Sequence, residues 1–310
     1  MSTQKLRELL QRFGLILSFL LLCVVLTLLS DRFLTVNNAV NVLRQSTING
    51  IIAVGMTFVI LTAGIDLSVG ATLALSTVVT ANLLQQGIPV LLAVLLGLVL
   101  GAAVGFLNGL IITKARVPPF VATLGMMTVG RGLALTYTQG RPITGLPEAF
   151  RFIGTGSLGP IPMPIVIAGL TFLVGWVVLS RTRIGEYIYA IGNNPVAARY
   201  AGIATDSYIT FVYVLAGLLS ALAGMILVAR LNSAQPTAGL GYEFDAIAAV
   251  VVGGTSFAGG EGSLGGTLLG VLVIAVINNG LNLLNVSSFY QPVVTGIVIA
   301  LALLIYRAIR

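Results

Sequence analysis

Residues 88–113 read IPVLLAVLLGLVLGAAVGFLNGLIIT and contain no charged side chain. A helix of about 20 apolar residues is long enough to cross a bilayer, so this stretch predicts a membrane span. Two other apolar runs, 46–63 and 244–258, are short or interrupted by glycine, and eight to eleven crossings all fit the chain. We predict about ten spans in a single all-α polytopic membrane domain over residues 1–310. The nine further runs lie roughly at 14–29, 46–63, 68–85, 117–138, 161–180, 207–230, 244–258, 263–285 and 289–306.

The composition supports this fold class. The 310 residues include 16 Lys and Arg and 9 Asp and Glu, so that only 8% are charged, and 57% are hydrophobic. A soluble domain usually carries about 25% charged residues. The low charge excludes a soluble globular domain, a disordered chain and a secreted disulfide scaffold.

Several kinds of chemistry are excluded by what the sequence lacks. It has no histidine, one cysteine (Cys23) and two lysines, Lys5 and Lys114. No serine–histidine–aspartate triad or histidine zinc motif can form, and neither lysine lies in a P-loop. We therefore expect no cofactor on this chain, and we expect any ATP to be hydrolysed by a partner. A membrane-embedded enzyme is disfavoured for the same reasons.

The basic residues predict how the chain is oriented. With ten spans, both ends lie on one side of the membrane, and the side with more Lys and Arg is normally cytoplasmic. The basic residues are spread along the chain, which is not typical of nucleic-acid binding. The predicted cytoplasmic side carries Lys5, Arg7, Arg12, Lys114, Arg116, Arg181, Arg183, Arg199, Arg307 and Arg310. The opposite side carries Arg32, Arg44, Arg141, Arg151 and Arg230.

Glycine is abundant, at 37 of 310 residues, and many glycines are four residues apart. Small residues at this spacing let membrane helices approach closely. Close packing is therefore expected along the glycines at 97, 101, 105 and 109, and again at Gly266 and Gly270. A weak internal repeat, S-x-G-x-T-L, occurs at 68–73 and 263–268. Interrupted helices at corresponding places in two halves are typical of transport sites, so helices starting at Ser68 and Ser263 are expected to face a polar cavity.

Few charged residues are predicted near the membrane interior. Asp66 and Arg131 are the two that we expect there, because charges in spans usually face a pathway or a partner. Asp66 either lines the substrate route or caps the span that follows it. Arg131 either lines the route or forms a structural ion pair. Glu243 and Asp245 are expected in the first turn of a span, where the helix dipole favours carboxylates.

The segment 181–206 is the longest predicted cytoplasmic stretch. Within it, Asn194 fits a helix N-cap, Pro195 the first helical position and Gly202 the position after the helix. A helix of two turns cannot be stable alone, so it must dock on something. Its alanines, Ala197, Ala198 and Ala201, predict a small flat surface. The surface docks either on the membrane bundle or in a groove of another protein.

At this point the sequence resembles a known family, the permease subunits of bacterial ABC importers for ribose and related monosaccharides. The resemblance covers nearly the whole chain. The segments that carry it are AVGMT at 53–57, ILTAGIDLSVG at 60–70, the residues from Gly185 to Gly202, SAQPTAG at 233–239, YEFDAIAAVVVGGTS at 242–256 and NNGLNLL at 278–284.

The resemblance implies a fold, a location and a set of partners. The fold would be that of type II ABC importer permeases, in the bacterial inner membrane. The partners would be a second copy of the chain, a cytoplasmic ATPase that binds ATP and Mg, and a periplasmic sugar-binding protein that docks on loops near 139–160 and 231–242. Coupling to the ATPase would fall to Gly185, Glu186, Asn193, Asn194, Pro195, Ala197, Ala198, Arg199 and Gly202.

The predicted function is ATP-driven import of a monosaccharide, with ribose as the expected substrate. Alternatives are xylose, galactose, arabinose, allose or autoinducer-2, or an ion-coupled secondary transporter. A pathway for a neutral sugar needs hydroxyls and amides more than charge. Each candidate amide could instead form an interhelical hydrogen bond, which we favour for Asn108 and Asn279. The candidate pathway residues are Asn49, Thr57, Asp66, Ser68, Asn108 and Asn279.

Overall fold

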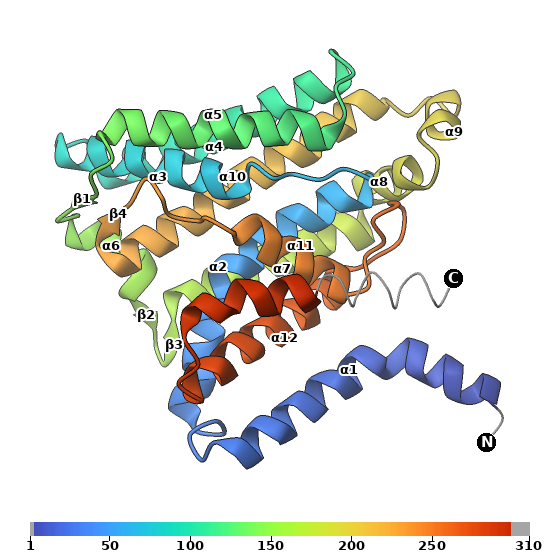
Figure 1. The fold of residues 1–310 in the computed structure, drawn as a ribbon. Coiled ribbons are helices and arrows are strands. Elements are labelled where there is room, and N and C mark those ends of the chain that lie inside the picture. Colours follow the sequence, from blue (N-terminus) through green and yellow to red (C-terminus); the bar gives the residue numbers. More distant parts are fainter. Residues whose placement is uncertain (1–2, 299–310) are drawn as a thin grey trace.

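The computed structural model describes residues 3–298 (Figure 1). The described chain is mostly helical, as predicted. The long helices are α1 (Thr3–Leu29), α2 (Val36–Leu61), α3 (Val69–Gln85), α4 (Val90–Thr113), α5 (Pro119–Thr138), α7 (Met163–Arg181), α10 (Thr205–Leu231) and α12 (Leu264–Leu283). The shorter ones are α6 (Glu148–Thr155), α8 (Arg183–Asn193), α9 (Pro195–Tyr200), α11 (Tyr242–Val252) and the 3₁₀ helix η1 (Ser288–Tyr290).

Five helices among the described residues, α2, α4, α7, α10 and α12, are long and apolar enough to cross a membrane. This confirms a multi-span membrane protein, while the count of ten stays a prediction. The predicted run 289–306 is helical over 291–298, and its remainder lies outside the described residues. Arg307 and Arg310, which enter the predicted orientation, also lie outside them.

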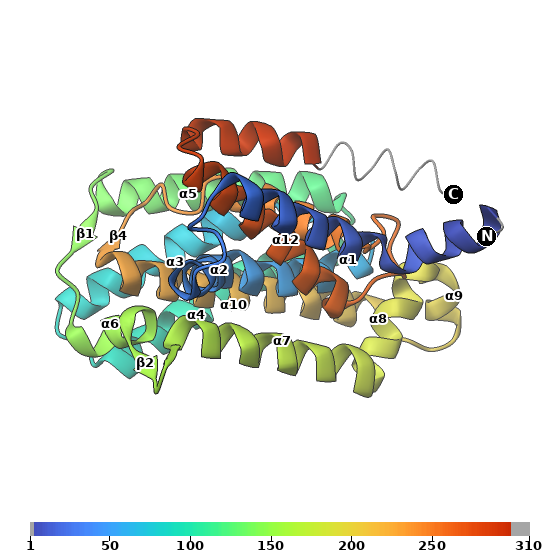
Figure 2. The same ribbon diagram turned by 90° about the horizontal axis from the view of Figure 1, so that it is seen from below.

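The bundle has a buried centre and an apolar outer surface. Of the most apolar 18 residues in each helix, 72% are buried in α2 and α10, but only 28% in α4 and 22% in α7. In Figure 2, α7 runs along one face of the bundle and residues 291–298 along the opposite face. Leucines such as Leu91 and Leu170 are exposed on the outer helices. Because lipid tails are apolar, this surface fits a bilayer.

The glycines of α4 pack where the spacing predicts. Gly101 lies against Gly217 of α10, and a Cβ on Gly101 would be only 2.5 Å from the carbonyl oxygen of Gly217. Gly270 of α12 lies in the same way against the backbone of Ala249 in α11. Both helix pairs therefore depend on glycine for their close approach.

Two helices begin inside the bundle. Between α2 and α3 the chain is non-helical over residues 62–68, and a non-helical segment of turns at 235–241 precedes α11 (Figure 1). The first turn of α3 meets the segment just before α11 at Gly70 and Gly239, and neither glycine has room for a side chain there. The two interrupted helices that meet are thus α3 and α11, whereas the S-x-G-x-T-L repeat pairs α3 with α12.

One predicted boundary was wrong. The apolar run at 46–63 belongs to a helix that begins ten residues earlier, at Val36, with Thr35 as its N-cap. The first part of α2 carries asparagines and Arg44, so it does not belong to the apolar run from which the span was predicted. These polar residues are accommodated because several of them line a cavity inside the bundle.

Four short strands lie at the end of the bundle away from α9. Strand β1 (Ile143–Thr144) pairs antiparallel with β4 (Ser233–Ala234), and β2 (Ser157–Leu158) pairs with β3 (Ile161–Pro162). The two loops expected to receive a binding protein, 139–160 and 231–242, are therefore joined by hydrogen bonds. We call this the β1 end and the other the α9 end (Figure 1).

Candidate functional sites

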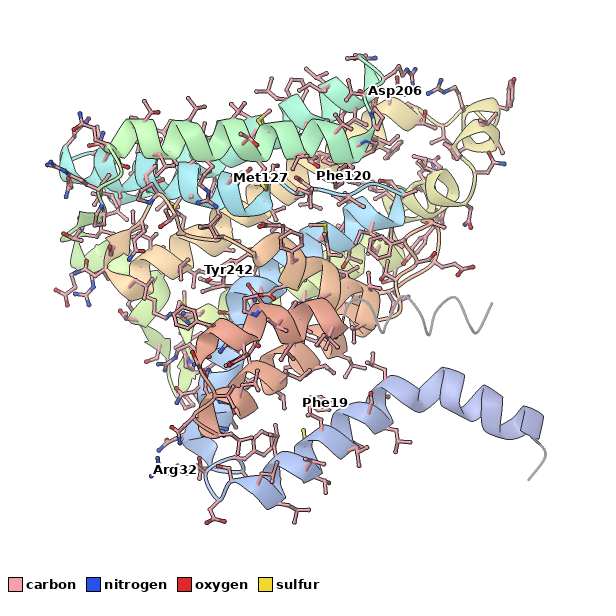
Figure 3. All side chains as sticks on the ribbon, in the orientation of Figure 1. Phe19, Arg32, Phe120, Met127, Asp206 and Tyr242 are labelled. Atoms are coloured by element: carbon pink, nitrogen blue, oxygen red, sulfur yellow. The ribbon has the colours of Figure 1, made fainter. Side chains whose placement is uncertain are left out.

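A polar cavity of about 400 Å³ lies between α2, α10, α11 and α12, and we call it the Asp245 cavity. It takes its lining from the first half of α2, the last turn of α10, the first turn of α11 and the second half of α12, so it lies toward the β1 end. Tyr242, one of its lining residues, is near the middle of the bundle in Figure 3. Its polar lining residues are Asn41, Arg44, Gln45, Ser46, Asn49, Arg230, Tyr242, Asp245, Asn278, Asn282 and Gln291.

This lining corrects the expectation that Asp66 and Arg131 are the charged residues of the interior. Arg44, Arg230 and Asp245 line the cavity, although Arg44 and Arg230 were assigned to loops. A signal was present in the spacing. Asn41, Gln45 and Asn49 follow each other at four-residue intervals, as do Asn278 and Asn282, and such residues share one helix face. The two polar faces, on α2 and α12, meet at the cavity.

Asp245 is held loosely between α2 and the segment after α12. Its Oδ2 accepts a hydrogen bond from Asn49 Nδ2, and its Oδ1 accepts one from Thr295 Oγ1, each at 3.3 Å. Asn49 is thus a predicted pathway residue that does line the cavity. A second cavity of about 300 Å³ adjoins the first and shares Tyr242, Asp245 and Asn278 with it. Asp245 lies in the first turn of α11, as expected.

Asp66 lies instead in a closed hydrogen-bonded cluster. It is 1% exposed, and its Oδ1 accepts bonds from Ser68 N (2.8 Å) and Ser68 Oγ (2.6 Å). Asn108 of α4 donates to Ser68 Oγ at 2.9 Å. Asp66 therefore orders the turn that starts α3, and none of these three residues lines the Asp245 cavity.

The non-helical backbone before α3 is satisfied by neighbouring helices. The carbonyl of Ile65 accepts hydrogen bonds from Thr123 Oγ1 of α5 (3.2 Å) and from Tyr213 Oη of α10 (3.4 Å). Irregular backbone inside a membrane is tolerated only with such partners or beside a polar cavity. Here side chains of α5 and α10 satisfy the backbone before α3. The polar cavity expected at Ser68 is not at this place but between α2, α10, α11 and α12.

Arg131 was expected either to line the route or to form an ion pair, but its hydrogen bonds go to backbone carbonyls. Its Nη1 donates to the carbonyls of Pro236 and Ala238, both at 2.7 Å, and so fixes the turns before α11. Nearby, Glu243 is 6% exposed in the first turn of α11, close to Gly70 at the start of α3. A carboxylate beside two helix N-termini is favourably placed.

Thr57 and Asn279 also bond within the protein. The hydroxyl of Thr57 donates to the carbonyl of Ala53 and lies 2.8 Å from the hydroxyl of Thr267 on α12. Asn279 exchanges two side-chain hydrogen bonds with Asn38 of α2, at 2.9 and 3.0 Å. Both residues link α2 to α12 and do not line the Asp245 cavity.

At the α9 end, the predicted short helix is present, and it begins and ends at the predicted residues. Asn194 Oδ1 caps the amides of Val196 and Ala197, Pro195 is the first helical residue, and Gly202 follows with φ +83°. Of the three alanines expected on its surface, Ala197 and Ala201 are exposed, whereas Ala198 is 4% exposed and faces into the chain. The exposed face also carries Val196 and Tyr200, which are 63% and 89% exposed.

The rest of the predicted coupling segment forms α8, which packs on α7, α10 and α2. Gly185 is buried against the backbone of Leu179, and Glu186 and Asn193 are exposed. Tyr189 Oη donates to the carbonyl of Gly262 at 2.9 Å and so ties α8 to the loop before α12.

Asp206 connects α9 to the bundle. This residue, in the first turn of α10, accepts a 2.8 Å hydrogen bond from Arg199 of α9 and lies within 4 Å of Lys114 and Arg116, which follow α4. Figure 3 shows Asp206 at the α9 end. Three of the cations assigned to one side of the membrane are therefore neighbours in space.

Comparison with known proteins fits a transport role for this architecture. A family model described as "Branched-chain amino acid transport system / permease component" matches residues 38–304. The chain belongs to this permease family. The match covers every element that lines the Asp245 cavity and the whole of α8 and α9. No solved structure matches the chain.

Individual relatives are also permeases. The chain is 54% identical over 299 residues to the ribose import permease protein RbsC of Bacillus subtilis (strain 168), covering 96% of this chain and 93% of the relative. It is 51% identical to RbsC of Escherichia coli (strain K12), over 94% and 92%. The D-allose transport system permease protein AlsC of the same strain is 39% identical, over 94% and 91%. The chain is therefore a transport subunit and not an enzyme.

Proposed function

We propose that this chain is the membrane permease of an ATP-driven importer that carries ribose across the bacterial inner membrane into the cytoplasm. The single observation that supports it most is a polar cavity inside an otherwise apolar bundle, lined by amides and by a few charged residues of both signs. The names of the relatives at 51–54% identity support ribose as the solute.

The residues that line the cavity lie toward the β1 end, and α9 lies at the opposite end. This arrangement supports alternating access, in which sugar enters from the periplasm at the β1 end and the ATPase acts from the cytoplasm at the α9 end. On this proposal the periplasmic sugar-binding protein docks over the joined loops at β1 and β4. Both termini are cytoplasmic, and the pore is completed by a second copy of the chain in the type II importer arrangement, with about ten spans in each copy.

The ATPase, which holds ATP and Mg, would dock on α9. Val196 and Tyr200 are one helical turn apart and expose apolar surface to solvent, which a partner groove would bury. Arg199 and Asp206 then transmit the movement of α9 to α4 and α10. Deletion of residues 194–202 should abolish assembly with the ATPase while the membrane bundle stays folded. Continued co-elution of the ATPase with the deleted chain would overturn this assignment.

The importer itself is tested by reconstitution. The chain, its ATPase and the periplasmic sugar-binding protein are placed in proteoliposomes, and ATP hydrolysis and uptake are measured across a panel of ribose, xylose, galactose, arabinose, allose and autoinducer-2. Ribose-loaded binding protein should stimulate hydrolysis and uptake most. Stimulation by another sugar would reassign the substrate, and uptake by the chain alone would favour a secondary transporter.

A further inference from the structure

We propose that the Asp245 cavity is a binding site of the permease itself for a neutral cyclic monosaccharide, held by Arg44, Asp245 and Asn278. The inference rests on the proposed function and adds to it, because a permease can in principle pass sugar through a pore that makes no specific contacts. The geometry assigns particular hydrogen-bonding atoms to the sugar.

Two buried atoms in the lining lack a hydrogen-bonding partner within the described part of the chain. They are Nε of Arg44 and Oδ1 of Asn278, on facing sides of the cavity in α2 and α12. Leaving a buried polar atom unpaired is unfavourable, and such atoms usually indicate a functional site or a missing partner. One of the two is a donor and the other an acceptor.

Asp245 offers further unused bonding capacity. An ionised carboxylate has about four acceptor positions, and Asp245 has two hydrogen bonds, both at 3.3 Å. These are long compared with the usual 2.7–3.2 Å for an N–H donor such as Asn49 and 2.5–3.0 Å for an O–H donor such as Thr295. A ligand with hydroxyl donors would therefore find free acceptor positions on the carboxylate beside the acceptor of Asn278.

These atoms together select the class of ligand. A fully deprotonated anion such as sulfate would pair with Arg44 and Arg230, but it would bring no donor for Asn278 and would be repelled by Asp245. A metal cation would suit Asp245 and Asn278 but would meet the guanidinium groups of Arg44 and Arg230. A hydroxyl both donates and accepts, so a polyol satisfies all three groups at once. The volume of about 400 Å³ is within the range of small-molecule sites.

A cysteine-protection experiment tests binding directly. Ser46 lines the cavity and becomes the single reactive thiol in the full-length chain carrying S46C and C23S. The protein is placed in lipid nanodiscs, and maleimide labelling is followed against ribose concentration. We expect ribose to slow labelling at least threefold, with half-protection at millimolar concentration. The same measurement on S180C with C23S, at the α9 end of α7, should show no protection.

Further variants identify the bonding atoms. N278A in the S46C background should raise the half-protection concentration about tenfold, while N278D, which keeps an acceptor oxygen, should stay within threefold of the parent. N82A is the matched control: it removes an amide at the β1 end that bonds Tyr137 and lies outside the cavity. It should leave protection unchanged. Should N278A fail to fold, protection of S46C by ribose in the parent, set against its absence in S180C, still tests binding at the cavity.

The outcomes separate this inference from the proposed function. If the reconstituted importer takes up ribose but ribose gives no protection of S46C, the cavity is not the sugar site and the inference is wrong. Stronger protection by inorganic phosphate than by ribose would also overturn it, since the site would then bind anions. Failure of the importer to take up ribose at all would instead reject the proposed function, whatever the labelling shows.

Discussion

Two polar clusters within the bundle contrast in how their hydrogen bonds are used. At Asp66, the carboxylate bonds the amide and hydroxyl of Ser68, and Asn108 closes the chain of contacts from α4. At Asp245, the bonds are long, two neighbouring atoms have no protein partner, and a cavity adjoins. Both clusters contain a carboxylate and an amide, so residue type does not distinguish them.

Whether a polar group inside a membrane protein is structural or binds a ligand therefore has to be judged from its hydrogen-bonding partners. Asp66 has short bonds to its own turn, and its surroundings are filled by protein, so its role is to start α3. Asn108 Oδ1 is the one atom of that cluster without a partner among the described residues, and it does not face the Asp245 cavity. Unused bonding capacity counts as evidence for a ligand where space for the ligand lies beside it.

The largest effect is expected from D66A. It leaves the amide and hydroxyl of Ser68 buried without an acceptor, at a cost of roughly 1–3 kcal/mol for each group. The yield of folded protein should fall sharply in fluorescence-detected gel filtration, and unfolding should occur at lower temperature. D66N keeps an acceptor oxygen and should retain most of the stability. A stable D66A protein that fails only in transport would contradict the assignment of Asp66 as structural and of Asp245 alone as part of the sugar site.

The next effect is expected from D245N, and it should appear in transport. The substitution preserves shape and one acceptor but removes the charge, and a hydrogen bond to a charged group contributes about 1.5–3 kcal/mol. The sugar concentration for half-maximal uptake should rise roughly tenfold or more. The melting temperature should stay close to that of the unchanged protein. A large loss of folded D245N protein would show that Asp245, like Asp66, is structural.

Adjacent residues on α12 give a sharper comparison. Asn279 bonds Asn38, whereas Asn278 faces the cavity. N279A should lower stability modestly, by roughly 0.6 kcal/mol for each interhelical bond lost, and leave the sugar dependence of uptake unchanged. Thermal unfolding and uptake measured on the same preparations would test this. A shift in sugar dependence as large as that of N278A would contradict the separation.

The smallest effect is expected from T57V. The hydroxyl of Thr57 bonds Ala53 and Thr267 away from the cavity, and valine fills nearly the same space. We expect a loss of stability on the order of 0.6 kcal/mol and no measurable change in uptake. Reduced uptake at normal stability would show that Thr57 does belong to the substrate pathway, as the sequence predicted.

Much of the fold could be predicted because a chain segment inside lipid must pair its own backbone groups, and an apolar stretch of sufficient length does so as a helix. Each described stretch that was predicted as a span contains a helix, since unpaired backbone is too costly in hydrocarbon. The Asn194–Gly202 helix and the glycine contacts of α4 could also be predicted, because capping and close approach depend on local residue type. The error at the start of α2 arose because polar residues there face a cavity that no local pattern measures.

The candidate site was less predictable. Of the six pathway residues nominated from the sequence, Asn49 lines the Asp245 cavity, whereas Asp66, Ser68 and Asn108 are bonded to one another. Whether an amide faces a neighbouring helix or a cavity depends on how the helices are rotated. Arg44 and Arg230 were assigned to loops because charge usually lies outside the hydrocarbon.

Charge content, helix caps and glycine spacing act locally, so the sequence was enough to predict a helical membrane protein with a short capped helix at one end. Only the packed structure shows that α3 meets the segment before α11 at Gly70 and Gly239, and that α2 and α12 turn their amides toward Asp245. These arrangements depend on packing between segments some 170 to 230 residues apart. Hydrogen bonds and voids at such contacts exist only once the helices have packed, so they leave no local signature in the chain.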